Sequence, residues 1–97
     1  MIEELVRRFA PWQAGLPDGA SATLELMPPA QRPKGAILDA RSGLRDMQTV
    51  FRESGDTNVT IVDLSTNEVI VEEYRVLETD EALDRLLADL SRWLRAE

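Results

Sequence analysis

The sequence predicts a single α+β domain over residues 1–97, with an antiparallel sheet of about four strands in the order α-β-β-α-β-β-α. Three observations favour this class. The chain is 97 residues long and 43% hydrophobic, which suffices for one core. Apolar residues recur at helical spacing near both ends of the chain. Between them, short segments alternate apolar and polar residues, as half-buried strands do.

The first expected element is a short N-terminal helix. Glu3 lies near its positive end and Arg8 near its negative end, as the helix dipole prefers. Pro11 is expected to end the helix, and Trp12 follows in a connecting segment, where it could anchor a partner. The apolar positions at i, i+3, i+4 and i+7 are Ile2, Leu5, Val6 and Phe9.

Two strands are expected next, with a proline-rich loop between them. In residues 20–27 apolar and polar side chains alternate, and residues 35–40 form a second short apolar segment. The segment PPAQRPKG, residues 28–35, contains three prolines, which remove three backbone donors. We therefore expect a loop there. A docking peptide for an aromatic groove is a weaker alternative, because the prolines do not match the P-x-x-P spacing.

Residues 42–55 fit two kinds of secondary structure. As a helix they begin at Ser42, a good N-cap residue, and end at Gly55, a good C-terminal residue. As a strand they alternate Met47, Thr49 and Phe51 with Gln48, Val50 and Arg52, and they contain β-branched residues. We expect the helix, because start and stop signals flank it. Its apolar stripe would consist of Leu44, Met47, Val50 and Phe51.

The segment NVTIVDLSTNEVIVEEYRV, which begins at Asn58, predicts a hairpin with apolar residues on both faces. Asn67 supplies the positive φ of a three-residue loop. One face would carry Val62, Leu64, Ile70 and Tyr74. The other would carry Val59, Ile61, Val69 and Val71. We expect both faces to be covered, because burying each such side chain contributes about 1.5–3 kcal/mol.

The C-terminal segment, residues 79–97, predicts a long amphipathic helix that covers one face of the sheet. Its apolar stripe consists of Leu83, Leu86, Leu87, Leu90, Trp93 and Leu94. The short first helix and the middle helix give modest cover for the other face. We therefore expect a homodimer, with a monomer that covers both faces itself as the alternative.

The residue inventory excludes several chemistries. The chain has no cysteine and no histidine, so disulfides, thiolate nucleophiles, Cys/His metal sites and imidazole catalysis are excluded. The five glycines form no phosphate-binding motif. Glu72 and Glu73 are adjacent in a strand and point to opposite faces, which does not suit a shared acid/base site. We expect no enzyme, no catalytic residues, no metal and no cofactor.

Charge is distributed unevenly along this acidic chain, whose net charge is −7. Residues 32–52 carry five basic and two acidic side chains, a local +3, whereas residues 53–97 carry twelve acidic and four basic ones, a local −8. On the helix interpretation, Arg41, Arg45 and Arg52 would form an exposed basic surface. That surface is the one candidate for recognising an anion.

Three functions follow as hypotheses. The first is a non-catalytic protein-interaction module, a small acidic homodimer that also binds another protein as an adaptor, a chaperone-like protein or an inhibitor/immunity-type partner. The second is a regulator that engages nucleic acid through the three arginines or mimics it; the negative charge disfavours direct binding. The third is a small-ligand-binding domain with a cleft between sheet and helix. No membrane span or secretory signal is visible, so we expect a cytoplasmic protein.

Overall fold

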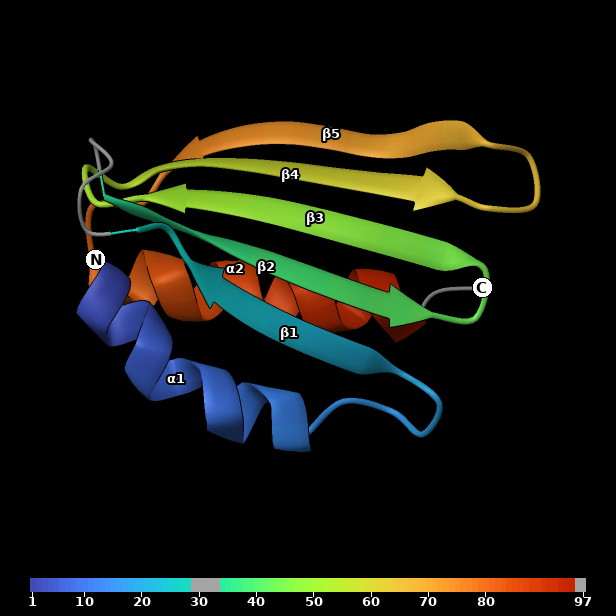
Figure 1. The fold of residues 1–97 in the computed structure, drawn as a ribbon, viewed down its shortest axis with the longest axis horizontal. Helices are drawn as coiled ribbons and strands as arrows, with labels where there is room; N and C mark the ends of the chain where they lie inside the picture. The colour runs from blue at the N-terminus through green and yellow to red at the C-terminus, as the bar shows by residue number, and fades with distance from the viewer. Residues whose placement is uncertain (29–33, 96–97) are drawn as a thin grey trace.

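The computed structural model describes residues 1–28 and 34–95. Two helices flank five strands along the chain (Figure 1). The elements are α1 (Ile2–Ala14), β1 (Ser21–Leu26), β2 (Gly35–Ser42), β3 (Arg45–Arg52), β4 (Asp56–Asp63), β5 (Glu68–Val76) and α2 (Asp80–Arg95). The predicted α+β class is confirmed, and the sheet has five strands where about four were expected.

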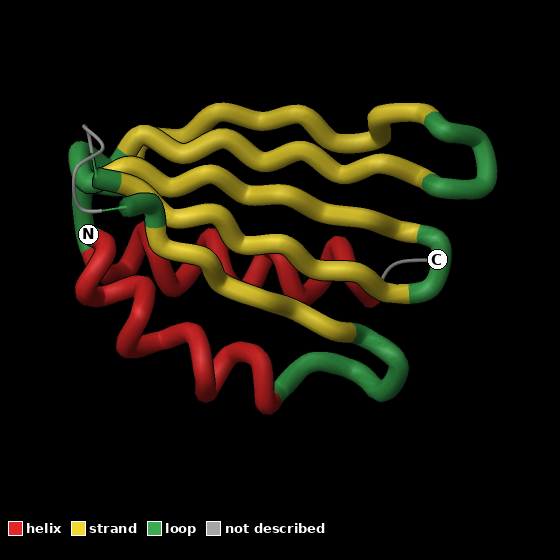
Figure 2. Tube along the Cα trace, viewed as in Figure 1, coloured by secondary structure: helices red, strands yellow, loops and turns green. Residues whose placement is uncertain are grey.

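The sheet is an antiparallel meander in which each strand pairs with its neighbours in the sequence, so β1 and β5 are its edges. The strands form one layer and the two helices form a second layer on one side of it (Figure 2). The helices are joined to each other by the indole of Trp12 on α1, whose Nε1 donates to the carbonyl oxygen of Leu87 on α2 at 2.9 Å. The core therefore lies between the inner face of the sheet and this pair of helices.

Small and large side chains alternate across the inner face of the sheet. Ala36 lies opposite Phe51, and Ala40 lies opposite Met47. All four side chains are buried, so the bulk of β3 fills the space that the alanines of β2 leave open. Leucines of α2 complete the core from the other side: Leu83, Leu86, Leu87, Leu90 and Leu94. The predicted C-terminal helix and its leucine stripe are confirmed.

The predicted middle helix over residues 42–55 is wrong, because this segment forms β3 and its two turns. Ser42 pairs with Arg45, which leaves Gly43 and Leu44 as a two-residue hairpin loop. Gly43 has a φ of 56°, as such a loop requires at its first position. Gly55, which was expected to end a helix, has a φ of 100° in the turn from β3 to β4. Both glycine signals thus belong to hairpin turns.

The N-terminal helix is present but longer than predicted. It continues through Pro11 to Ala14. Proline removes one backbone donor, yet the residues after it are held by tertiary contacts. The Trp12 indole is bonded to α2, and Nε2 of Gln13 donates to the carbonyl oxygen of Ala22 on β1 at 2.7 Å. These contacts stabilise the last turn against the proline.

The β4–β5 hairpin was predicted correctly in its position and in the positive φ of Asn67, which is 61°. Its register differs near the loop. An irregularity after Ile61 shifts the pairing, so that Val62 lies opposite Val69 and Asp63 opposite Glu68. Val69 was predicted to share a face with Ile61. The observed register instead places Val69 beside Val62 on the outer face. The bulge allows both Val69 and Ile70 to be exposed.

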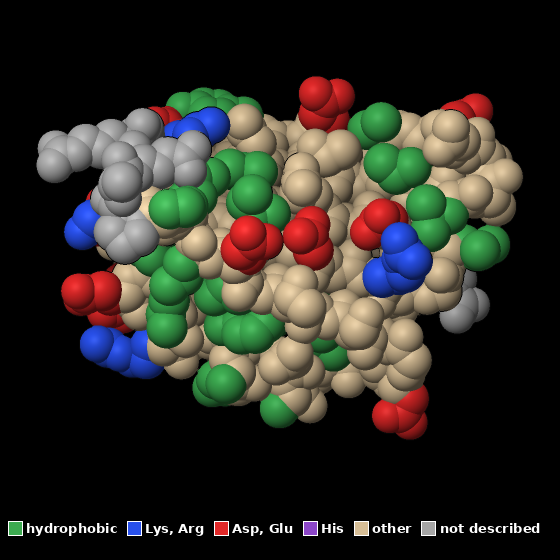
Figure 3. Space-filling model, in the orientation of Figure 1, with side chains coloured by type: hydrophobic (Ala, Val, Ile, Leu, Met, Phe, Trp, Pro, Cys, Tyr) green, Lys and Arg blue, Asp and Glu red, His purple; other side chains and the backbone are tan. Residues whose placement is uncertain are grey.

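The expectation that both faces of this hairpin are covered is wrong for the single chain. The inner face is packed under α2, with Val59 and Ile61 buried. The outer face of the sheet is open, and Figure 3 views the molecule from this side. Its middle row is polar from edge to edge, which explains why it needs no cover. That row consists of Thr23, Asp39, Gln48, Thr60 and Glu72.

Two further predictions concern the proline-rich loop and the absence of a membrane span. The predicted loop over residues 28–35 lies largely outside the described residues, since residues 29–33 are not described. In the part of the chain that is described, neither helix is long and apolar enough to cross a membrane.

Candidate interaction surface at one end of the sheet

Exposed hydrophobic side chains gather at the end of the sheet formed by the β2–β3 and β4–β5 loops. We call Leu44, Leu64, Val69 and Ile70 the distal patch; their exposed fractions are 61%, 40%, 54% and 41%. The backbone N–H of Leu64 donates to the carbonyl oxygen of Leu44 at 2.6 Å, so the two loops are in direct contact. Figure 3 shows hydrophobic groups at this end of the open face, with charged groups beside them.

A second group of apolar side chains lies at the opposite end of the open face. Tyr74 and Val76 are exposed there, on the edge strand β5. The Tyr74 hydroxyl donates to Asp56, and Asp56 also lies opposite Val76 in the sheet. This carboxylate interrupts the apolar surface, so the distal patch is the better candidate for contact with an apolar partner.

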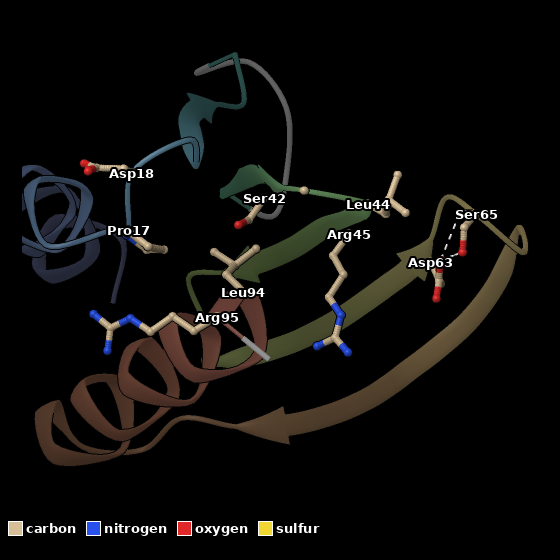
Figure 4. A pocket seen from close by; sticks show the side chains of 10 residues that line it. Pro17, Asp18, Ser42, Leu44, Arg45, Asp63, Ser65, Leu94 and Arg95 are labelled. Atoms are coloured by element: carbon tan, nitrogen blue, oxygen red, sulfur yellow. Dashed lines mark hydrogen bonds between the residues drawn. The ribbon is translucent and has the colours of Figure 1, made fainter. Parts of the chain in front are cut away.

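A cavity of about 450 Å³ lies next to the distal patch, and we call it the distal pocket. The α1–β1 connection, the β2–β3 loop, the β4–β5 loop and the end of α2 converge on it (Figure 4). Pro17, Leu44 and Leu94 give it apolar walls. Its polar lining consists of Asp18, Ser42, Arg45, Asp63, Ser65 and Arg95.

Backbone carbonyls hold the two arginines of the distal pocket in place. Nη1 of Arg45 donates to the carbonyl oxygen of Trp93 at 2.8 Å, in the last turn of α2. A cation is favourable there, because the last carbonyls of a helix carry partial negative charge. Nη2 of Arg95 donates to the carbonyl oxygen of Gly15 at 3.2 Å. Each guanidinium has five N–H donors, so both retain donors for another acceptor.

The carboxylate of Asp63 is occupied by the β4–β5 loop. Its Oδ1 accepts hydrogen bonds from the hydroxyl of Ser65 at 2.6 Å and from the backbone N–H of Ser65 at 2.9 Å. These bonds, the hydroxyl first, lower the pKa of Asp63 below its ordinary value. Asp63 is therefore an ionised residue that fixes the loop, and its geometry does not suit a proton donor.

The three arginines of the predicted basic surface do not come together. Arg45 points to the helix side of the sheet and binds the end of α2. Arg41 and Arg52 lie at opposite ends of β2 and β3, since Arg41 pairs with Asp46 and Arg52 with Gly35. Asp46 and Arg52 are six positions apart along an extended strand, a distance of about 20 Å. Arg41 also forms an ion pair with Asp46 at 3.3 Å.

The predicted apolar contact residues divide between the core and the surface. Val59 and Ile61 are buried under α2, and Val71 is half-buried beside them, so none of the three is open to a partner. Val69 is exposed and belongs to the distal patch. Trp12 packs against the core and hydrogen bonds to α2, so in this structure it contacts its own chain.

Sequence reasoning missed Leu44 and Leu64 as surface residues. Leu44 was placed on the stripe of a helix that does not exist. The pair Gly43-Leu44 between alternating segments was the available signal, because a glycine at the first loop position is typical of a two-residue hairpin. Leu64 was placed in a strand, whereas the observed strand ends at Asp63.

Within residues 1–28 and 34–95, no three carboxylates are grouped so as to hold a metal ion. The distal pocket can bind an acceptor through its arginines and an apolar group through its leucines.

A scan against protein-family models found no match, and searches of the curated proteins and of the solved structures found no similar protein either.

Proposed function

We propose that this protein is a non-catalytic protein-interaction module that forms a homodimer through the distal patch. The observation that supports the proposal is the exposure of four hydrophobic side chains at one end of a sheet whose middle is polar. Burying such side chains contributes about 1.5–3 kcal/mol each when the cover is complete. A partner that covers the patch would gain much of this free energy.

A second copy of the chain suits this patch because the charges beside it have both signs. The row of the outer face nearest the patch contains Arg41, Asp46, Val62 and Val69 in neighbouring strands. Arg41 and Asp46 are exposed at the side of the valines. A two-fold axis that passes between Arg41 and Asp46 would bring the Arg41 of each copy near the Asp46 of the other.

The dimer leaves the opposite end of the open face and the outer side of α2 accessible. These surfaces would receive a second protein, in the role of an adaptor, a chaperone-like protein or an inhibitor/immunity-type partner. Acidic residues outnumber basic ones in residues 53–97 by twelve to four, which favours a basic partner.

The test is the mass in solution across a range of concentrations, measured by sedimentation. The expected wild-type mass at high concentration is twice that of the 10.9 kDa chain. The substitutions Leu44→Ser and Val69→Ser should each weaken dimerisation about tenfold, because each removes about 1.4 kcal/mol or more of apolar burial. Val6→Ser is the matched control, since Val6 is 46% exposed but lies on α1.

Two results would overturn the homodimer. The first is a wild-type protein that remains monomeric at millimolar concentration. The second is a dimer that Val6→Ser weakens as much as Leu44→Ser does, because the interface would then not be the distal patch.

A further inference from the structure

We infer that the distal pocket is a binding site for a carboxylate attached to an apolar group. The arginines of the pocket would bind the carboxylate, and its apolar walls would receive the attached group. This site shares Leu44 with the distal patch, but the pocket is formed within one chain, so ligand binding does not require the homodimer.

The size and shape of the pocket suit a small ligand. Its volume of about 450 Å³ falls within the range of cavities that bind small molecules. Figure 4 shows Leu94 pointing from α2 toward Ser42, and Pro17 pointing inward from the α1–β1 connection. Because these elements are fixed by the core and by backbone hydrogen bonds, the apolar walls are formed before any ligand arrives.

Two arginines, Arg45 and Arg95, line the pocket of this acidic protein. Among the described residues, Arg45 and Arg95 form no ion pair with a carboxylate, although both hydrogen bond to backbone carbonyls. Within the same part of the chain, Arg52 and Arg85 likewise form none, but they do not line the pocket. The arginines with at least one carboxylate partner are Arg7, Arg8, Arg41, Arg75 and Arg92. Arg45 and Arg95 both line this cavity, with their guanidinium groups pointing in different directions (Figure 4), and each can attract an anion.

The two acidic residues of the lining, Asp18 and Asp63, form no ion pair with Arg45 or Arg95. Figure 4 shows the carboxylate of Asp18 directed away from the other lining side chains. The Oδ1 atom of Asp63 already accepts two hydrogen bonds from Ser65. Asp63 lies opposite Arg45 in the sheet but forms no ion pair with it, so the guanidinium keeps donors for a ligand.

A single carboxylate fits better than a phosphate or another multiply charged anion. Asp63 lies nearby, and the whole chain carries a net charge of −7, so each added negative charge is repelled. A guanidinium binds a carboxylate with two parallel N–H···O bonds, and one negative charge suffices for this. The apolar walls add affinity only if the ligand carries an apolar group.

The experiment is a titration of the ¹⁵N-labelled protein followed by two-dimensional NMR. Octanoate is the probe, with octanol as the neutral analogue and acetate as the analogue without an apolar chain. Octanoate should shift the amide signals of Gly43, Leu44, Arg45 and Leu94, with an affinity at least tenfold higher than that of octanol or acetate. A tripeptide Gly-Gly-Leu, with a free or an amidated C-terminus, tests whether a peptide carboxylate can supply the same chemistry.

Two matched substitutions assign the site. Arg45→Gln should weaken octanoate binding about tenfold, whereas Arg7→Gln, on the exposed side of α1, should leave it unchanged. Arg95→Gln is a second test on an exposed side chain, and we expect a loss of threefold or more. Retention of the wild-type amide spectrum outside the pocket shows that each variant is folded.

The site is supported if octanoate or the free tripeptide binds and if Arg45→Gln or Arg95→Gln abolishes this binding. The probe that binds shows whether a fatty carboxylate or a peptide C-terminus supplies the carboxylate. The inference is overturned if neither carboxylate binds, if octanol binds as tightly as octanoate, or if Arg7→Gln has the same effect as Arg45→Gln. Sedimentation of the same samples reports the oligomeric state separately, so failure of this site and failure of the homodimer are distinguishable.

Discussion

The indole Nε1 of Trp12 donates a hydrogen bond to the carbonyl oxygen of Leu87, which lies 75 positions later in the chain. The bond connects α1 to α2 beside the core. We expect Trp12→Phe to lower the free energy of unfolding by about 1 kcal/mol, because the ring is retained and the hydrogen bond is lost. Urea unfolding followed by circular dichroism measures this change. Val6→Ala on the exposed side of the same helix should change it by less than about 0.5 kcal/mol.

The hydroxyl of Thr49 is buried in the core without a hydrogen-bond partner. We expect Thr49→Val to raise the free energy of unfolding by about 1 kcal/mol, because valine has the same shape and no polar group to desolvate. Thr57 is the matched control. It is equally buried, but its hydroxyl donates to the carbonyl oxygen of Gly55 at 3.0 Å.

Thr57→Val should therefore lower the free energy of unfolding by about 1 kcal/mol. Thermal and urea unfolding of both variants measure the two changes in the free energy of unfolding, which should have opposite signs. Equal destabilisation by both substitutions would contradict the assignment of Thr49 as an unsatisfied group.

Gly55 lies where the turn after β3 touches the segment after β5. A Cβ on Gly55 would collide with the carbonyl oxygen of Leu77, and its φ of 100° also disfavours other residues. Gly43 has a positive φ as well, but nothing lies within 4 Å of its Cβ position. We expect Gly43→Ala to cost about 1–2 kcal/mol from backbone strain alone.

Gly55→Ala should cost clearly more than this, because the backbone must also shift. The midpoints of urea unfolding compare the two variants. A smaller loss for Gly55→Ala than for Gly43→Ala would show that the turn relaxes without affecting Leu77.

A hydrogen bond between the side chains of Tyr74 and Asp56 on the outer face shifts the pKa of both groups. The hydrogen bond from the Tyr74 hydroxyl, followed by that from Ser54, lowers the pKa of Asp56, and the same bond raises the pKa of Tyr74. Because the pKa of Asp56 is lower when folded, its contribution to stability is present above the unfolded value of about 3.9 and is lost as the pH falls through the folded value. The contribution of Tyr74 is present below about pH 10 and is lost as the pH rises through its raised value.

Tyr74→Phe should raise the pKa of Asp56 toward its ordinary value. A pH titration of the carboxyl ¹³C signals measures this pKa directly. The pKa of Asp63, which Ser65 lowers at the other end of the sheet, should not change. An unchanged pKa of Asp56 would contradict the hydrogen bond from Tyr74.

The sequence predicted the elements whose apolar pattern fits one periodicity. The leucines of α2 repeat only at helical spacing, and the β4–β5 hairpin alternates around Asn67. Residues 42–55 fit both periodicities, and a tertiary contact decided between them. Phe51 and Met47 fill the space opposite Ala36 and Ala40, which a strand permits and local propensity does not encode.

The candidate site was predictable only in part, because it is assembled from loops. Arg45 was identified by its charge, but its contact with Trp93 joins segments 48 residues apart. The exposure of Val69 depends on a bulge in β5, which shifts the register by one residue. A single such shift changes which face a side chain occupies, so the alternation of the sequence alone cannot give the distal patch.

The meander also has a consequence for how the chain folds. Each strand pairs with its sequence neighbour, so the whole sheet can grow by the closure of short loops. The contact between the two terminal helices, by contrast, must close nearly the entire chain. We therefore expect hairpin formation to precede helix docking, and removal of α1 should leave the refolding rate of the sheet nearly unchanged while accelerating its unfolding.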